Sequence, residues 1–187
     1  MRFTVLVKRY AKALLDVAIN NDKVDIILHD MKLVDESLGN SVELRNVIEQ
    51  PFISKSHKKN ILEKLFKDRI SEQTLNFLKL MVDKNREDII INIYEKYYEL
   101  YLEHMKIAVV TITSAVSLDD VTRQRIVNII KKKIADGSTI EINNVINKDI
   151  IGGFIVNYKD FHYDASVKGT LKHLHNNFSE NLFVKGY

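Results

Sequence analysis

The first half of the chain carries hydrophobic residues at intervals of three and four, the spacing that lines one side of an α-helix. Helices are predicted over residues 3–20, 23–38, 41–50, 55–67, 72–83 and 86–106. Polar or helix-breaking residues separate them, including Pro51, which disfavours the helical conformation in the residue before it. We therefore expect residues 1–106 to form a six-helix bundle.

The hydrophobic pattern changes after residue 106. β-branched residues dominate residues 107–115, which predicts a strand, and residues 138–146 and 153–158 predict two more. Helices are predicted between and after them, over residues 118–135 and 165–183. The predicted fold class is therefore α+β, in which residues 107–187 form a small C-terminal α/β domain with about three strands and two helices.

The segment from Ile150 to Leu171 combines several turn and capping signals. Gly152 and Gly153 are adjacent and come directly before an apolar run, where paired glycines permit a sharp reversal or a close backbone approach. Asp164 stands where its carboxylate would accept the free amides at the start of the last helix. We assign structural roles to these three residues and to Pro51.

This segment, with Ile140 and Ile142 upstream, resembles the C-terminal signature of the ATP synthase delta subunit family. The mitochondrial relatives in that family are called the oligomycin-sensitivity-conferring protein. Other family motifs have counterparts in the same order, namely Tyr10-Ala-Lys-Ala-Leu-Leu-Asp-Val-Ala18, Pro51-Phe-Ile-Ser-Lys, Asn76-Phe-Leu-Lys-Leu and Asn85-Arg86. The chain departs from the family at Lys159-Asp160, where a glycine usually begins the turn, and at His162, where an apolar strand residue is expected.

The first predicted helix is apolar over an arc of roughly 200°, wider than the arc that packing on one side requires. The fifth helix is similarly broad. One such helix could run through the bundle centre, and the sixth is the better candidate for that place. We therefore expect helices one and five to share a groove for a helix of another protein. The residues expected there are Tyr10, Ala13, Leu14, Val17, Phe77 and Leu80.

The final helix has a narrow apolar seam of the coiled-coil type, formed by Val167, Leu171, Leu174, Phe178 and Leu182. From the residues alone, the seam could dock onto the sheet of its own domain or meet a long helix of a partner. The family resemblance implies two partners. The groove would receive the N-terminal helix of an alpha subunit of the catalytic head, and the C-terminal domain would contact a b-type peripheral-stalk subunit.

Composition excludes several other classes of protein. The 187 residues contain no cysteine, which excludes disulfide bonds. Although 45% of the residues are hydrophobic, no apolar run reaches the roughly 20 residues that span a bilayer. The first helix begins almost at Met1, so we expect no transit peptide and a bacterial source. The resemblance then implies a peripheral protein on the cytoplasmic face of the bacterial inner membrane.

No catalytic or cofactor-binding constellation stands out. The six histidines form no metal-binding motif, and Gly152-Gly153 lacks the lysine and hydroxyl residue of a phosphate-binding loop. We therefore expect no cofactor, no metal and no enzyme activity. The resemblance implies a non-catalytic stator subunit of an F-type ATP synthase, which keeps the head from turning with the rotor. The alternative is a basic helical nucleic-acid-binding protein, but the net charge of +3 is spread along the chain rather than clustered.

Overall fold

The computed structural model describes residues 2–133 and 139–182. The chain divides into two compact units, Met1–His104 and Met105–Tyr187. Helices make up the first unit, and the second combines helices with a sheet. The mixed α+β class predicted from the sequence is therefore confirmed.

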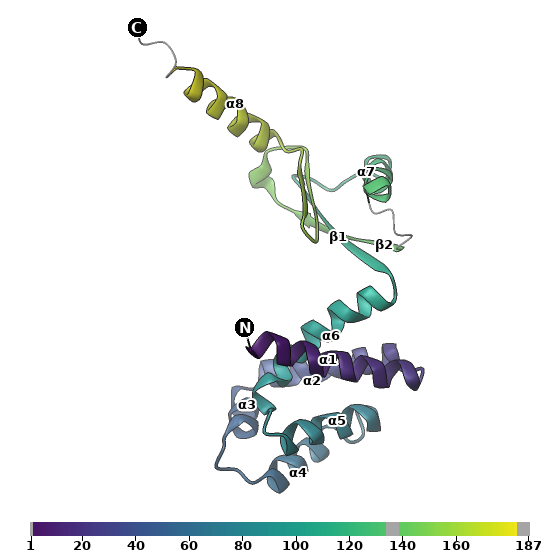
Figure 1. Ribbon diagram of the computed structural model, residues 1–187. Helices are drawn as coiled ribbons and strands as arrows, with labels where there is room; N and C mark the ends of the chain where they lie inside the picture. The colour runs from purple at the N-terminus through teal and green to yellow at the C-terminus, as the bar shows by residue number, and fades with distance from the viewer. Residues whose placement is uncertain (1, 134–138, 183–187) are drawn as a thin grey trace. The chain divides into compact units, whose positions relative to one another are not determined.

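The helices of the first unit follow one another with short connections (Figure 1). They are α1 (Arg2–Asn20), α2 (Val24–Asn40), α3 (Val42–Glu49), α4 (Lys55–Phe66), α5 (Glu72–Asp83), the 3-10 turn η1 (Glu87–Ile89) and α6 (Ile90–His104). The sixth helix predicted from the sequence, over residues 86–106, thus consists of two elements, the 3-10 turn η1 and the helix α6. The residue before Pro51 is extended, with φ −67° and ψ 121°, so α3 stops where the proline requires.

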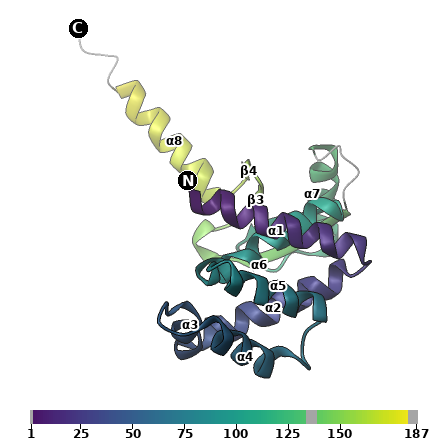
Figure 2. The ribbon, with the colours of Figure 1, turned by 60° about the horizontal axis from the view of Figure 1, so that its bottom comes forward.

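Helix α6 packs against both α1 and α2 (Figure 2). The side chains of Ile90, Ile93 and Tyr97 are buried. The Tyr97 hydroxyl donates a hydrogen bond to the Val24 carbonyl oxygen at 3.1 Å, and burial raises the pKa of this phenol. Helix α6 does not fill the central place that the sequence favoured for it, because only one of its faces is buried and Asn92, Glu95 and Tyr98 are exposed.

The second unit is built on a sheet with strand order β2-β1-β3-β4. Its elements are β1 (Ile107–Ser114), α7 (Asp120–Lys133), β2 (Thr139–Ile146), the 3-10 turn η2 (Lys148–Ile150), β3 (Phe154–Tyr158), β4 (Phe161–Asp164) and α8 (Val167–Leu182). Strand β1 pairs in parallel with β2 and antiparallel with β3, and β3 and β4 form a hairpin. One face of the sheet is apolar and packs on Ile126 and Ile130 of α7.

Strand β4 was missed, so the prediction of about three strands was too low. It has only four residues, and all but the half-buried Phe161 are exposed, so no apolar run of ordinary strand length marks it in the sequence. The hairpin turns at Lys159, whose positive φ of 47° a glycine would adopt more easily. His162 pairs with Asn157 of β3 and forms a side-chain hydrogen bond with it, so a polar residue fits this exposed position.

The adjacent glycines lie where the chain between β4 and α8 passes close to the start of β3. Gly153 has a φ of +75°, and a Cβ there would stand 2.2 Å from the carbonyl oxygen of Ala165. Backbone hydrogen bonds close the contact, from Val167 N–H to the Gly152 oxygen and from Ala165 N–H to the Phe154 oxygen, both at 3.0 Å. The close backbone approach predicted at this pair is confirmed.

The capping role predicted for Asp164 is wrong in one respect. Helix α8 begins at Val167, and its first turn is capped by Ser166, whose Oγ accepts a hydrogen bond from Gly169 N–H at 2.9 Å. Asp164 acts one step earlier, because its Oδ1 accepts the Ser166 N–H at 2.8 Å. The carboxylate therefore fixes the capping residue rather than the helix itself.

Replacing Gly153 with alanine should strongly destabilise the second unit. The new methyl group would overlap the Ala165 carbonyl, and the positive φ would be strained, at a cost of about 2 kcal/mol or more. Thermal unfolding of the variant should show this loss. Gly39→Ala is the matched control, because a Cβ at Gly39 meets nothing within 4 Å. Equal stability of the Gly153→Ala variant and the wild type would contradict the close contact.

The start of α8 should loosen in acid. Hydrogen bonds from the Ser166 side chain and backbone N–H hold the pKa of Asp164 below its ordinary value of 3.8. A lowered pKa in the folded state means that the stabilisation is complete above pH 3.8 and is lost as the pH falls through the folded value. The protection of Ser166 and Gly169 against hydrogen exchange, relative to the intrinsic rate at each pH, should therefore fall below that pH. The Asp164→Asn variant should lack this pH-dependent loss of protection, and an identical pH profile in both proteins would contradict the assignment.

Candidate functional site: the groove between α1 and α5

A hollow of about 620 Å³ opens between α1 and α5. It is lined by Arg9, Tyr10, Ala13, Leu14, Val17, Gln73, Asn76, Phe77 and Leu80. The six apolar residues of this lining are the six that the sequence predicts for a shared groove. The structure thus brings together side chains that lie about 60 positions apart in the sequence.

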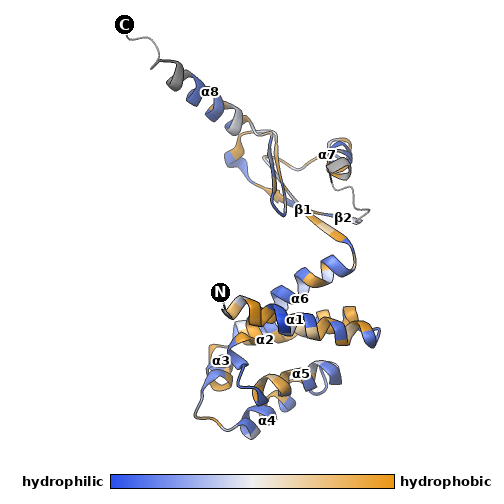
Figure 3. Ribbon diagram, in the orientation of Figure 1, coloured by the Kyte–Doolittle hydropathy of each residue, from blue (hydrophilic) through white to orange (hydrophobic). Residues whose placement is uncertain are grey.

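The groove has a buried floor and exposed walls. Leu14 and Phe77 are 2% and 8% exposed and form the floor, whereas Val17 and Leu80 are each 44% exposed. Ala13 is also exposed, and its small side chain leaves room above the helix backbone. In Figure 3, hydrophobic residues run along much of α1, although one side of this helix lacks a covering element of its own unit. The result is an apolar groove open to solvent.

The groove exists because α1 and α5 pack against different neighbouring helices. Helix α1 packs on α6 and α2, and buries Ala11, Leu15 and Ala18. Helix α5 packs on α4 and α2, and buries Leu78 and Met81. Each helix therefore uses one apolar face for its own unit and keeps a second for the groove. This double use explains the broad apolar arcs in the sequence.

Sequence reasoning missed the polar residues of the lining, Arg9, Gln73 and Asn76. Gln73 accepts a hydrogen bond from Lys23 Nζ at 3.3 Å, and this bond ties the first turn of α5 to the segment after α1. Polar residues at the rim of a groove alternate with apolar ones, as they do on any solvated helix face. The sequence therefore gives no signal that distinguishes these three residues from ordinary surface residues.

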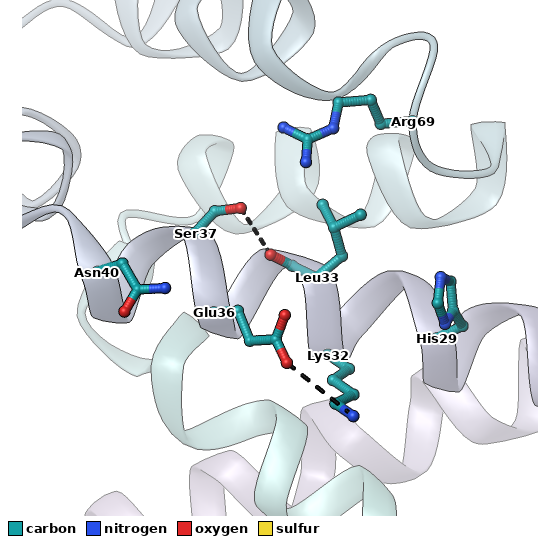
Figure 4. A pocket seen from close by; sticks show the side chains of 7 residues that line it. All are labelled: His29, Lys32, Leu33, Glu36, Ser37, Asn40 and Arg69. Atoms are coloured by element: carbon teal, nitrogen blue, oxygen red, sulfur yellow. Dashed lines mark hydrogen bonds and ion pairs between the residues drawn. The ribbon is translucent and has the colours of Figure 1, made fainter.

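A second hollow, of about 340 Å³, lies on α2 and has a different character (Figure 4). Its lining is mostly polar and comprises His29, Lys32, Leu33, Glu36, Ser37, Asn40 and Arg69. Some of these groups satisfy one another, because Lys32 and Glu36 lie 4.0 Å apart and Ser37 donates to the Leu33 carbonyl oxygen. Leu33 is the one aliphatic side chain in this lining, so the hollow offers little apolar surface to a helix.

The apolar seam of α8 is exposed in its first half. Val167, Leu171 and Leu174 are 43%, 53% and 48% exposed, respectively. These three residues are not covered by the sheet of their own unit, so docking of the seam onto that sheet is wrong for this half of the helix. The side chains of Phe178 and Leu182, the other two predicted members, lie outside the described part of the chain.

Comparison with known proteins identifies the family. The family model for the ATP synthase delta (OSCP) subunit matches residues 6–178. A protein of Protochlamydia amoebophila named ATP synthase subunit delta is 35% identical over 166 residues, which cover 89% of this chain and 91% of the relative. A protein of the same name from Prochlorococcus marinus strain MIT 9301 is 33% identical over 168 residues, covering 88% of this chain and 91% of the relative.

A chain in the cryo-EM structure of the Toxoplasma gondii mitochondrial ATP synthase hexamer has the same fold. The TM-score is 0.61 at 19% identity, and the match covers 92% of this chain and 97% of the other. This likeness concerns the fold alone.

The class is thus a peripheral-stalk subunit of an F-type ATP synthase, which has no catalytic role of its own. The chain belongs to the ATP synthase delta (OSCP) subunit family. In the part of the chain that the structure describes, no helix is long and apolar enough to cross a membrane.

Proposed function

We propose that this chain joins the catalytic head of the ATP synthase to its peripheral stalk through its two units. The groove between α1 and α5 binds the N-terminal helix of an alpha subunit, and the second unit binds a b-type stalk subunit through α8. The chain thereby keeps the head from rotating with the rotor during proton-driven ATP synthesis. It acts on the cytoplasmic face of a bacterial inner membrane, to which only the complex holds it.

The open apolar groove is the observation that carries this proposal. An α-helix with its side chains is about 10 Å across, and it needs an apolar groove flanked by walls to bury one face. The groove between α1 and α5 has a floor of Leu14 and Phe77 and walls that include Val17 and Leu80. The exposed Ala13 lets the guest helix approach the backbone of α1 closely.

The apolar character of the groove suits a mechanical brace. A stator must release its partners slowly, and nanomolar binding corresponds to about −12 kcal/mol. Exposed ion pairs contribute only about 0–1 kcal/mol each, whereas burial of a large apolar side chain contributes roughly 1.5–3 kcal/mol. A few side chains such as Val17 and Leu80, covered by a guest helix, therefore contribute more than many surface charges would.

A single cation in the described lining of the groove favours an acidic residue on the guest helix. Arg9 is exposed on α1 and lines the groove. Complementary charges at a rim mainly raise the association rate and fix the orientation of the partner. We therefore expect an acidic residue beside the apolar face of the alpha-subunit helix.

Binding of the stalk through α8 rests on its uncovered seam. The spacing of Val167, Leu171 and Leu174 matches the a and d positions of a coiled coil, in which each apolar residue inserts between residues of a facing helix. All three are substantially exposed, so a partner helix would bury them without unpacking the second unit. A long stalk helix provides such a partner.

Introducing a charge into the groove should prevent assembly with the head. In the Ala13→Asp variant, a carboxylate would be buried under the guest helix without a partner, at a cost of at least about 2 kcal/mol, or roughly 30-fold in affinity. The measurement is the dissociation constant of the full chain for the isolated catalytic head. Val5→Asp is the matched control, because Val5 is 69% exposed on the same helix and does not line the groove. Wild-type affinity of the Ala13→Asp variant would contradict the groove assignment.

A charge in the seam of α8 should release the stalk alone. The Leu171→Glu variant should lose binding to a b-subunit fragment by about tenfold or more, because the seam could no longer be covered by an apolar partner. Asn176→Glu, on the opposite side of α8, should bind normally. Both variants should bind the head as the wild type does. Loss of both contacts in Leu171→Glu would refute the division of labour between the units.

A further inference from the structure

We propose that Asp30 is a positioning residue for the groove, because it holds the first turn of α5 in place from the far side of that helix. Asp30 lies on α2 and is only 4% exposed. Its Oδ2 accepts hydrogen bonds from Ser71 N–H at 2.9 Å, from the Ser71 hydroxyl at 2.6 Å and from the Thr74 hydroxyl at 2.8 Å. This inference rests on the proposed binding of a helix in the groove.

The carboxylate is matched to its place at the start of a helix. Ser71 is the N-cap of α5, and its Oγ accepts the Thr74 N–H at 3.4 Å while its hydroxyl donates to Asp30. The free amides and the dipole at a helix N-terminus favour a negative charge. A buried carboxylate is tolerated when several donors satisfy it, and here the donors all belong to the first turn of α5. Asp30 therefore ties α2 to α5 at a defined point.

The same turn of α5 leads into the groove wall. Thr74 is fully buried on the side toward α2, whereas Gln73, Asn76 and Phe77 line the groove. Movement of the first turn away from α2 would change the distance between these residues and α1. Asp30 touches none of the groove lining directly, so it would act on the guest helix only through α5.

Within the described chain, the other polar contacts that α5 makes with more distant residues are more exposed than Asp30, and all but one lie toward its C-terminal end. The exception is the part-buried hydrogen bond from Lys23 to Gln73. Lys59 forms an ion pair with Asp83 at 2.6 Å, and Lys79 forms one with Glu63 at 3.1 Å, and all four side chains are 27–49% exposed. Lys55 donates to the Asp83 carbonyl oxygen, which is also at the C-terminal end. The Asp30 contacts are thus the buried polar anchor of the N-terminal half of α5 among the described residues.

The test measures groove geometry and affinity separately in the full chain carrying Asp30→Asn. The chain has no cysteine, so Asp16→Cys on α1 and Glu72→Cys on α5, both exposed, admit a pair of nitroxide labels. The distance distribution between the labels should broaden or shift in Asp30→Asn. The dissociation constant for a synthetic peptide of the alpha-subunit N-terminal segment from the same organism should rise about tenfold.

Glu87→Gln is the matched control. It removes the charge of another buried carboxylate, whose partner Lys58 on α4 lies 2.7 Å away, and so destabilises the same unit without touching the first turn of α5. At a temperature where both variants are folded, Glu87→Gln should keep the wild-type label distance and peptide affinity. Unchanged distance and affinity in Asp30→Asn, or equal changes in both variants, would overturn the inference.

Two further measurements keep the outcomes distinct. If Asp30→Asn does not fold, Thr74→Val removes one of the three hydrogen bonds with little change of shape, and wild-type distance and affinity in that variant would overturn the inference. If the wild-type chain fails to bind the peptide, the proposed function is contradicted. The label distances, measured without peptide, still decide whether Asp30 positions α5.

Discussion

The architecture of the first unit depends on the packing of α1 and α5 against different neighbours. Because α1 packs on α6 and α2 while α5 packs on α4 and α2, the facing sides of α1 and α5 meet no covering element in the described part of the unit. An apolar surface therefore remains open between them without any loss of the core, which is formed by other residues of the same helices. The groove is thus a product of helix packing and needs no movement to form.

In the second unit, the main structural constraint acts on the start of α8 and sets the direction in which this helix leaves the sheet. The close contact of Gly152 and Gly153 with the segment 165–167 fixes the start of this helix, and Ser166, held by Asp164, caps its first turn. Beyond this point α8 extends away from its own sheet (Figure 1), and the described part of its apolar seam is exposed. A rigid base and an uncovered helix suit the transmission of a mechanical load to another helix.

Much of this could be predicted from the sequence, for identifiable reasons. Helix periodicity and broad apolar arcs located the six groove residues, and the paired glycines located the close approach. Strand β4 was missed because it is nearly all exposed, and the cap of α8 was misplaced because Asp164 and Ser166 are both good capping residues. Arg9, Gln73 and Asn76 could not be found, because a polar residue at a groove rim has the same local pattern as one in solvent. Asp30 was equally hidden, since its partners lie about 40 residues away.

Hydrogen exchange of the full chain, alone and bound to the catalytic head, tests the central claim most directly. The account predicts that binding slows exchange in α1 and α5, over residues 9–17 and 73–80, and leaves the hollow on α2 unchanged. Protection that appears around His29 and Arg69 while the α1 and α5 segments exchange as in the free chain would contradict it.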